Sequence, residues 1–167
     1  MSKDFAYDQI DAVDLDLLRL LQEDGTLSSA ALSERLSMTV TPCWRRRKRM
    51  EELGIIKDYQ TNLDRRKLGY DVMAFAQVRF GNHSANAPDE FEQVIMKLPQ
   101  VLSCHKVTGE ADYVLTVLAT DLESYGIFVE EVLRRQPGIS SIQSSLALRE
   151  IKAVSRIPVG KTGRQQT

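Results

Sequence analysis

Residues 37–54 constrain the fold more than any other stretch, because both ends of a single helix are marked in them. Thr39 suits the N-cap position, Pro42 falls in the first turn, where its missing N–H costs nothing, and Gly54 stands where a helix stops. The segment therefore predicts one helix with a single core-facing side. Six positions at helical spacing are expected on that side: Val40, Cys43, Trp44, Arg47, Met50 and Leu53.

The remaining surface of this helix is basic, since residues 45–49 are a run of five cations. Such runs are more often solvated helix faces than binding sites, so the preceding segment decides between the two. Residues 30–36 have the pattern of a short helix capped by Ser28 or Ser29, and residues 37–39 form a turn of helix-turn-helix length. A basic second helix is expected of a pair that binds DNA in the major groove. The residues expected to contact DNA are Ser37, Thr39, Thr41, Pro42, Arg45, Arg46, Lys48 and Arg49.

The distribution of charge supports a basic face, although the whole chain is balanced, with 22 Lys and Arg against 23 Asp and Glu. Residues 1–34 carry two basic and eight acidic side chains, a net charge of −6. Residues 35–69 carry ten basic and four acidic side chains, a net charge of +6. A chain that segregates charge in this way presents a local positive surface, as binding to duplex DNA requires.

The composition argues against several other kinds of site. Cys43 and Cys104 lie far apart without a second pair, so neither a disulfide framework nor a zinc site is expected. His83 and His105 have no ligand partners at metal spacing. The N-terminus is acidic and polar, unlike a signal peptide, and no apolar run approaches membrane-spanning length. We therefore expect a cytoplasmic protein that uses no metal or cofactor and does not bind membranes.

The segments around the basic helix complete a small domain. Residues 10–23 have the pattern of an amphipathic helix on which the helix-turn-helix pair would pack. Residues 55–63 are rich in β-forming residues and could form a wing, and residues 64–70 are charged and polar, as expected of a linker. The sequence therefore predicts a winged helix-turn-helix domain over residues 1–63.

The second half of the chain repeats the order strand, helix, strand. A βαββαβ order implies an α+β ferredoxin-like sandwich over residues 71–152, in which two helices cover one face of an antiparallel sheet. The uncovered face carries apolar side chains, so we expect it to be buried in a dimer or a larger assembly. Residues 153–167 would form a polar, frayed tail. Strands are expected at residues 72–80, 101–108, 113–119 and 139–152, with helices at residues 89–98 and after Asp121.

The turn between the second and third strands could bind a free amino acid, which presents an ammonium and a carboxylate on one carbon. Gly109 permits a tight turn with exposed N–H groups, and Glu110 and Asp112 offer carboxylates two residues apart. An ordinary hairpin with solvated acids fits the same residues, and the residues alone favour that interpretation. The candidate effector-binding residues are Thr108, Gly109, Glu110, Ala111 and Asp112.

Seven short elements follow one another across residues 10–152: Ile10–Asp14, Glu23–Ser28, Thr41–Trp44, Leu53–Ile56, Leu68–Gly69, Val107–Tyr113 and Ser144–Lys152. In order and spacing they resemble the leucine-responsive / asparagine-synthesis (Lrp/AsnC) family of transcription regulators. The resemblance implies an N-terminal winged helix-turn-helix domain and a C-terminal domain that oligomerises and senses amino acids. It also implies homodimers paired through their sheets, which assemble further into octamers and bind the effector where dimers meet.

Two positions depart from that family pattern. Arg47 stands on the expected core stripe where similar proteins have an aliphatic residue, and burying an unpaired arginine is costly. We therefore expect Arg47 to extend to the helix edge and reach a phosphate or an acidic partner on the first helix. Ala111 stands where the family's sensing hairpin has a bulky residue. That leaves room for an apolar effector such as leucine or methionine, or a small one such as cysteine or alanine.

Three functions stay open at this point. The first, which the resemblance favours, is an effector-responsive transcription regulator that binds double-stranded DNA and controls genes of amino-acid metabolism or transport. The second is an architectural protein of the same fold that wraps DNA without sensing anything. The third is an amino-acid-metabolising enzyme, but the sequence offers no nucleophile–base pair, phosphate-binding glycine loop or metal cluster to support one.

Overall fold

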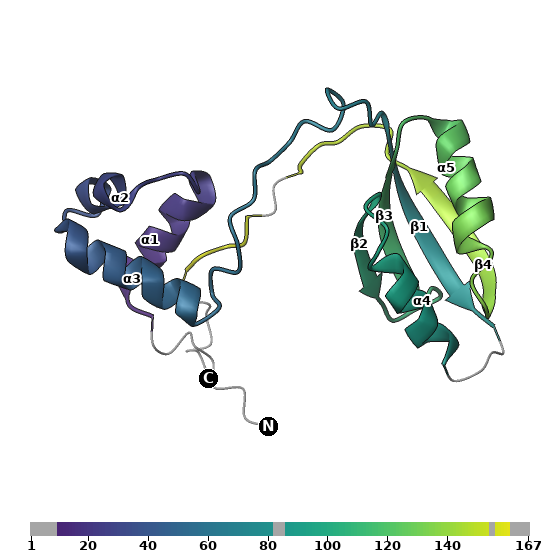
Figure 1. The fold of residues 1–167 in the computed structure, drawn as a ribbon, viewed down its shortest axis with the longest axis horizontal. Helices are drawn as coiled ribbons and strands as arrows, with labels where there is room; N and C mark the ends of the chain where they lie inside the picture. The colour runs from purple at the N-terminus through teal and green to yellow at the C-terminus, as the bar shows by residue number, and fades with distance from the viewer. Residues whose placement is uncertain (1–9, 82–85, 154–155, 161–167) are drawn as a thin grey trace. The chain divides into compact units, whose positions relative to one another are not determined.

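The computed structural model describes residues 10–81, 86–153 and 156–160, and the chain forms two compact units (Figure 1). One unit comprises Met1–Asn62 together with Val154–Thr167, and the other comprises Leu63–Ala153. His83 and much of the predicted tail, residues 154–155 and 161–167, lie outside the described residues.

The first unit contains the three predicted helices: α1 (Ala12–Glu23), α2 (Ser29–Arg35) and α3 (Val40–Glu52). The start of α1 is fixed by a capping box, in which the side chains of Asp11 and Asp14 each accept a hydrogen bond from the other's backbone N–H. Ser28 caps α2, and the turn before α3 passes through Ser37 in a left-handed conformation (φ 52°). These features confirm the helix-turn-helix pair.

The core of this unit lies between α1, α2 and α3, and it corrects the predicted stripe on α3. Of that stripe only Cys43 and Met50 are buried, whereas Val40, Trp44 and Leu53 are exposed. The side chains that share the core are Leu17, Leu18, Leu21, Leu27 and Leu32, together with Cys43 and Met50. The predicted wing also differs, because residues 55–63 contain no strand.

A short C-terminal segment packs against α1, although the sequence predicts a frayed tail. The side-chain amide of Gln22 donates to the carbonyl of Ile157 (3.1 Å) and accepts from its N–H (2.8 Å). Arg19 Nε donates to the carbonyl of Val159 (2.9 Å), and Val159 packs against the helical core. Residues 156–160 are therefore part of the helical unit.

The second unit is the predicted ferredoxin-like sandwich. Its strands are β1 (Val72–Phe80), β2 (Val101–Lys106), β3 (Tyr113–Ala119) and β4 (Ile139–Leu146), and all pairings are antiparallel in the order β2-β3-β1-β4. The helices are α4 (Ala87–Ile95) and α5 (Leu122–Phe128), the latter continued by a π-helical turn, η2 (Val129–Leu133). Asp121 caps α5 as predicted, accepting from Ser124 N–H at 2.7 Å. Strands β2 and β4 end earlier than expected.

Both helices cover the same face of this sheet, as Figure 1 shows. Phe91 of α4 and Phe128 of α5 pack with the inward residues of β1, which are Ala74, Ala76, Val78 and Phe80. The opposite face is mixed rather than mainly apolar. It carries Met73, Phe75, Val114 and Leu118 beside polar side chains such as Thr116, Gln77 and Ser145. No helix in the described part of the chain could span a membrane.

Candidate functional site

The outward side of α3 carries most of the residues expected to contact DNA. Thr41, Arg45 and Lys48 lie opposite the buried side formed by Cys43 and Met50, and all three are exposed. Ser37, Thr39 and Pro42 are also exposed, on the turn and the first turn of the helix. Arg45 makes no hydrogen bond or ion pair with any of the described residues, whereas Lys48 lies 3.8 Å from Glu52. The outward side is therefore polar and cationic, with one arginine uncommitted.

The other two predicted DNA contacts, Arg46 and Arg49, bind a carboxylate inside the protein. Arg46 Nη1 lies 2.8 Å from Asp14 Oδ1 and 2.5 Å from Asp11 Oδ2. Arg49 pairs with the second carboxylate oxygen of Asp14, whose side chain is fully buried. Because a buried carboxylate needs compensating charge, both arginines are required within the fold. They join α3 to the start of α1.

The surroundings of α3 and of the start of α1 shift the pKa values of two nearby groups. The pKa of Asp11 is lowered below its usual 3.8, chiefly because the carboxylate accepts a hydrogen bond from Asp14 N–H, and secondly because Arg46 lies beside it. Burial raises the pKa of the Cys43 thiol above its usual value. Cys43 is therefore a protonated core residue at neutral pH and not a reactive thiolate.

Arg47 behaves differently from the expectation. It does extend to the helix edge, but its partners are not on α1. Its Nε donates to Glu51 Oε1 (3.2 Å) and to the hydroxyl of Tyr59 (2.9 Å), and Nη1 donates to the carbonyl of Leu27 (3.0 Å). The acidic partner is thus on α3 itself. This arginine closes the helical core at its edge, over the Tyr59 ring at 4.7 Å.

The candidate effector-binding residues lie together on the loop between β2 and β3. Thr108, Gly109 and Glu110 are exposed, and Ala111 and Asp112 are half-buried. No described residue accepts a hydrogen bond from the N–H groups of residues 108–111. Gly109 has φ +121°, and a Cβ there would meet nothing within 4 Å. Glycine is therefore needed at this position for its backbone conformation and not for space.

Asp112 has a structural role that the sequence did not indicate. Its carboxylate accepts from Phe80 N–H at 2.7 Å, its N–H donates to the carbonyl of Val78, and its carbonyl accepts from Val107 N–H. These bonds fix the hairpin to the end of β1. Glu110 is therefore the freer of the two acids in the loop.

Asp14 is the residue at this site whose role in pairing Arg46 and Arg49 was not predicted from the sequence. The signal was present, since Asp14 is followed on α1 by Leu15, Leu17 and Leu18 and thus lies on the apolar side of that helix. An acid on the buried side of a helix needs a cationic partner, and the run at residues 45–49 is the source of one. Within residues 10–81, 86–153 and 156–160, no three His, Cys, Asp or Glu side chains cluster as metal ligands would.

Two family profiles match the chain. Residues 10–57 match the profile described as winged helix-turn-helix DNA-binding, and residues 73–157 match the Lrp/AsnC ligand binding domain. The chain belongs to the Lrp/AsnC family. It is a DNA-binding transcription regulator with a ligand-binding domain of the Lrp/AsnC type, and not an enzyme.

Curated relatives of this Lrp/AsnC protein align over nearly their whole length. The DNA-binding transcriptional activator DecR of Escherichia coli (strain K12) is 37% identical over 150 residues, which cover 90% of this chain and 99% of DecR. The Bkd operon transcriptional regulator of Pseudomonas aeruginosa is 35% identical over 151 residues, with coverage of 90% and 99%.

Solved structures of other transcription regulators also resemble this chain over most of its length. A transcriptional regulator from Neisseria meningitidis in complex with L-Met is 36% identical, with a TM-score of 0.86 over 89% of this chain and 96% of that one. An AsnC family regulator from Agrobacterium tumefaciens is 33% identical, with a TM-score of 0.84 over 89% and 97%. The predicted fold class, a winged helix-turn-helix domain followed by an α+β sandwich, is confirmed.

Proposed function

We propose that the outward side of α3 contacts duplex DNA and that the loop between β2 and β3 binds a small amino acid which alters that contact. The proposed contact with DNA is supported chiefly by the position of Arg45. It lies between Thr41 and Lys48 on the exposed side of α3, and none of the described residues pairs with it. An uncommitted guanidinium near the start of a recognition helix can bind a phosphate or a guanine edge without first breaking an internal contact.

The salt dependence of DNA binding tests this role. Replacing Arg45 with Ala removes one phosphate-neutralising charge, so the slope of log affinity against log salt should shrink by about 0.9. Lys97→Ala, which removes an exposed charge from the other unit, is the matched control and should leave the slope unchanged. An Arg45→Ala protein with the wild-type slope would show that Arg45 does not contact phosphate.

The proposed effector site uses the donors and acids of the loop. Thr108 offers an exposed hydroxyl and residues 108–111 offer N–H groups for the effector carboxylate, while Glu110 offers a carboxylate for its ammonium. Asp112 holds the loop to β1 and contributes negative charge. Ala111 leaves room for an apolar or small side chain, whereas an aspartate effector would be repelled. The L-Met complex of the Neisseria regulator supports this preference.

Calorimetry with each of the twenty amino acids tests the effector site. We expect an apolar amino acid, with methionine and leucine as the first candidates, to bind the wild type. Glu110→Gln should weaken that binding by about 1.5–3 kcal/mol, the scale of a hydrogen bond to a charged group. Glu123→Gln, an exposed acid on α5, is the control. If no amino acid binds below the millimolar range, the protein is better described as an architectural DNA-binding protein than as an amino-acid sensor.

The uncovered face of the sheet would pair two chains into a homodimer, and contacts between dimers near residues 108–112 would build an octamer. We propose that the assembly works in the cytoplasm on promoters of amino-acid metabolism or transport genes. The regulated operon of the Pseudomonas relative is consistent with such targets.

A further inference from the structure

Trp44 is the largest exposed apolar side chain on α3, although its spacing predicts burial. It is 49% exposed, and Val40, four residues earlier on the same flank, is also 49% exposed. A single exposed apolar residue needs no explanation, but two neighbours on the most basic helix of the chain form an apolar patch within a cationic surface. Their place in the first half of α3 is where recognition helices meet base edges.

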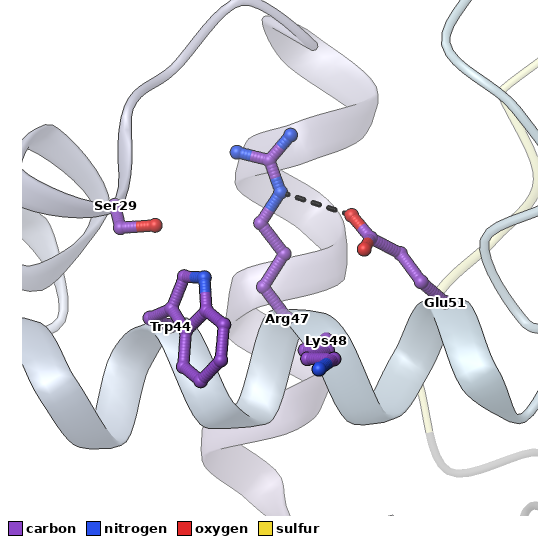
Figure 2. A pocket seen from close by; sticks show the side chains of 5 residues that line it. All are labelled: Ser29, Trp44, Arg47, Lys48 and Glu51. Carbon is purple, nitrogen blue, oxygen red and sulfur yellow. Dashed lines mark hydrogen bonds and ion pairs between the residues drawn. The ribbon is translucent and has the colours of Figure 1, made fainter.

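Trp44 also forms one wall of a hollow beside α3. The hollow has a volume of about 420 Å³ and is lined by Ser29, Trp44, Arg47, Lys48 and Glu51 (Figure 2). Its far wall is fixed, since Arg47 is held by Glu51, Tyr59 and the carbonyl of Leu27. Figure 2 shows the Arg47 side chain extended away from α3 toward Glu51, apart from the indole of Trp44. The wall of the hollow opposite Trp44 is thus preformed.

The charge beside the indole is complementary to nucleic acid. Lys48 Nζ lies 5.2 Å from the centroid of the Trp44 ring, and its ion pair with Glu52 is long and exposed. Lys48 can therefore turn to a phosphate at little cost. The indole N–H of Trp44 has no hydrogen-bond partner among the described residues. An apolar ring beside an N–H that no described residue binds and a weakly paired cation matches the edge of a DNA groove, where methyl groups lie close to phosphates.

We infer that Trp44 is a specificity-determining residue which packs against the C5-methyl group of a thymine in the operator, while Lys48 binds the adjacent phosphate. The inference rests on DNA binding through α3, but it assigns sequence reading to a residue outside the polar contacts proposed above. In the major groove the thymine methyl is the one apolar group on a base-pair edge, and contact with it distinguishes T·A from the other pairs. Val40 would extend the same apolar contact toward the start of the helix.

The chain contains one tryptophan, so its fluorescence reports on Trp44 alone. The DNA would be a duplex of about 30 bp, roughly three helical turns, selected by the full-length protein from a randomised pool. Acrylamide quenching of the wild type is compared with and without saturating duplex. We expect the quenching constant to fall by at least about half, because the half-exposed indole becomes covered. An unchanged quenching constant at saturation would overturn the inference without any variant.

Replacing each thymine with deoxyuridine, which lacks only the C5-methyl group, tests the contact itself. At one position the replacement should weaken wild-type binding about fourfold, the value of one buried methyl group. Trp44→Ala should bind the thymine duplex about tenfold more weakly and should lose the difference between the two duplexes. Trp44→Phe should keep part of that difference, and Met96→Ala, an exposed apolar residue of the other unit, should keep all of it.

These outcomes separate base reading from simple proximity. Protection of Trp44 from acrylamide without a deoxyuridine effect at any position would overturn the inference, because the indole would then be covered but not reading a base. A deoxyuridine effect that persists in Trp44→Ala would also overturn it, by assigning the methyl contact to another residue. If Arg45→Ala lowers the slope of log affinity against log salt while Trp44→Ala changes nothing, DNA binding through α3 stands and only the role of Trp44 fails.

Discussion

Asp14 shows at the scale of one residue how a basic helix can serve both the fold and a surface. It is a fully buried charged side chain, and two of the five consecutive cations of α3 are held by it. Neighbouring cations of one charge run therefore have different partners. Arg46 and Arg49 face α1, whereas Arg45 and Lys48 face outward. Removing one cation from this run should affect stability or DNA binding according to the side on which it lies.

Breaking the Asp14 cluster should destabilise the helical unit. We expect Asp14→Ala to lower the free energy of unfolding by about 2–3 kcal/mol, less than the loss of a fully buried ion pair costs, because Arg46 and Arg49 are partly hydrated. Asp16→Ala, two residues away and exposed, should change it by less than about 0.5 kcal/mol. Urea unfolding measures both. Equal effects of the two substitutions would contradict the assigned role of Asp14.

The capping carboxylate of Asp11 should make stability depend on acid pH. Its folded-state pKa lies below the usual 3.8, so its contribution is fully present above that value and is lost as the pH falls through the folded-state pKa. Asparagine can still cap the helix but does not titrate. Between pH 5 and about pH 2, Asp11→Asn should therefore lose less thermal stability than the wild type. Parallel curves of melting temperature against pH would refute this.

At the scale of elements, the ends of helices could be predicted from the sequence better than their buried sides. The limits of α3 follow from local signals, Thr39, Pro42 and Gly54, and they agree with the structure. Which flank of α3 is buried depends on where α1 lies, and spacing within α3 does not contain that information. Spacing therefore placed Trp44 and Leu53 inside, whereas the structure leaves both exposed and largely covers Arg46, which lay off the predicted stripe.

Contacts between residues far apart in the sequence, at the hairpin and at residues 156–160, could not be predicted either. The hydrogen bond from Phe80 N–H to Asp112 joins residues 32 positions apart, and the two between Gln22 and Ile157 join residues 135 positions apart. Neither contact leaves a periodic or capping signal in the sequence. The acids and the glycine of the hairpin could be proposed as a site from their chemistry. Only the structure shows that Asp112 fixes the hairpin to β1, whereas Glu110 is the freer acid.

The docked segment at residues 156–160 should stabilise the helical unit through Gln22. Ending the chain at residue 155 removes both hydrogen bonds to Ile157 and the packing of Val159, and should cost about 1–2 kcal/mol of unfolding free energy. Gln22→Ala should cost about 1 kcal/mol in the full chain but close to nothing in the shortened one. Chemical denaturation of the four proteins gives the coupling. Additive effects would mean that Gln22 does not act through the tail.

At the scale of the whole molecule, self-association is expected through the sheet face that no helix covers. The sequence predicted this face from the βαββαβ order, because two helices can cover only one side of the sheet. Its composition was less predictable, since the register of β1 with β3 and β4 decides which residues lie side by side. Phe75 is flanked by Thr116 and Ser145, so an apolar centre is bordered by hydroxyl groups. Such a face suits a dimer contact with both packing and hydrogen bonds.

Phe75→Glu in the full-length chain should convert a dimer into a monomer. Phe75 is 39% exposed at the centre of the face, and a dimer contact would bury the new carboxylate without a partner. That costs about 3 kcal/mol, so the dissociation constant should rise by about two orders of magnitude. Ile127→Glu, an equally drastic change at an exposed position on α5, should leave the dimer intact. Sedimentation equilibrium distinguishes the two variants. If Phe75→Glu sediments as the wild type does, the sheet face does not mediate assembly; if Ile127→Glu dissociates instead, the helix-covered side does.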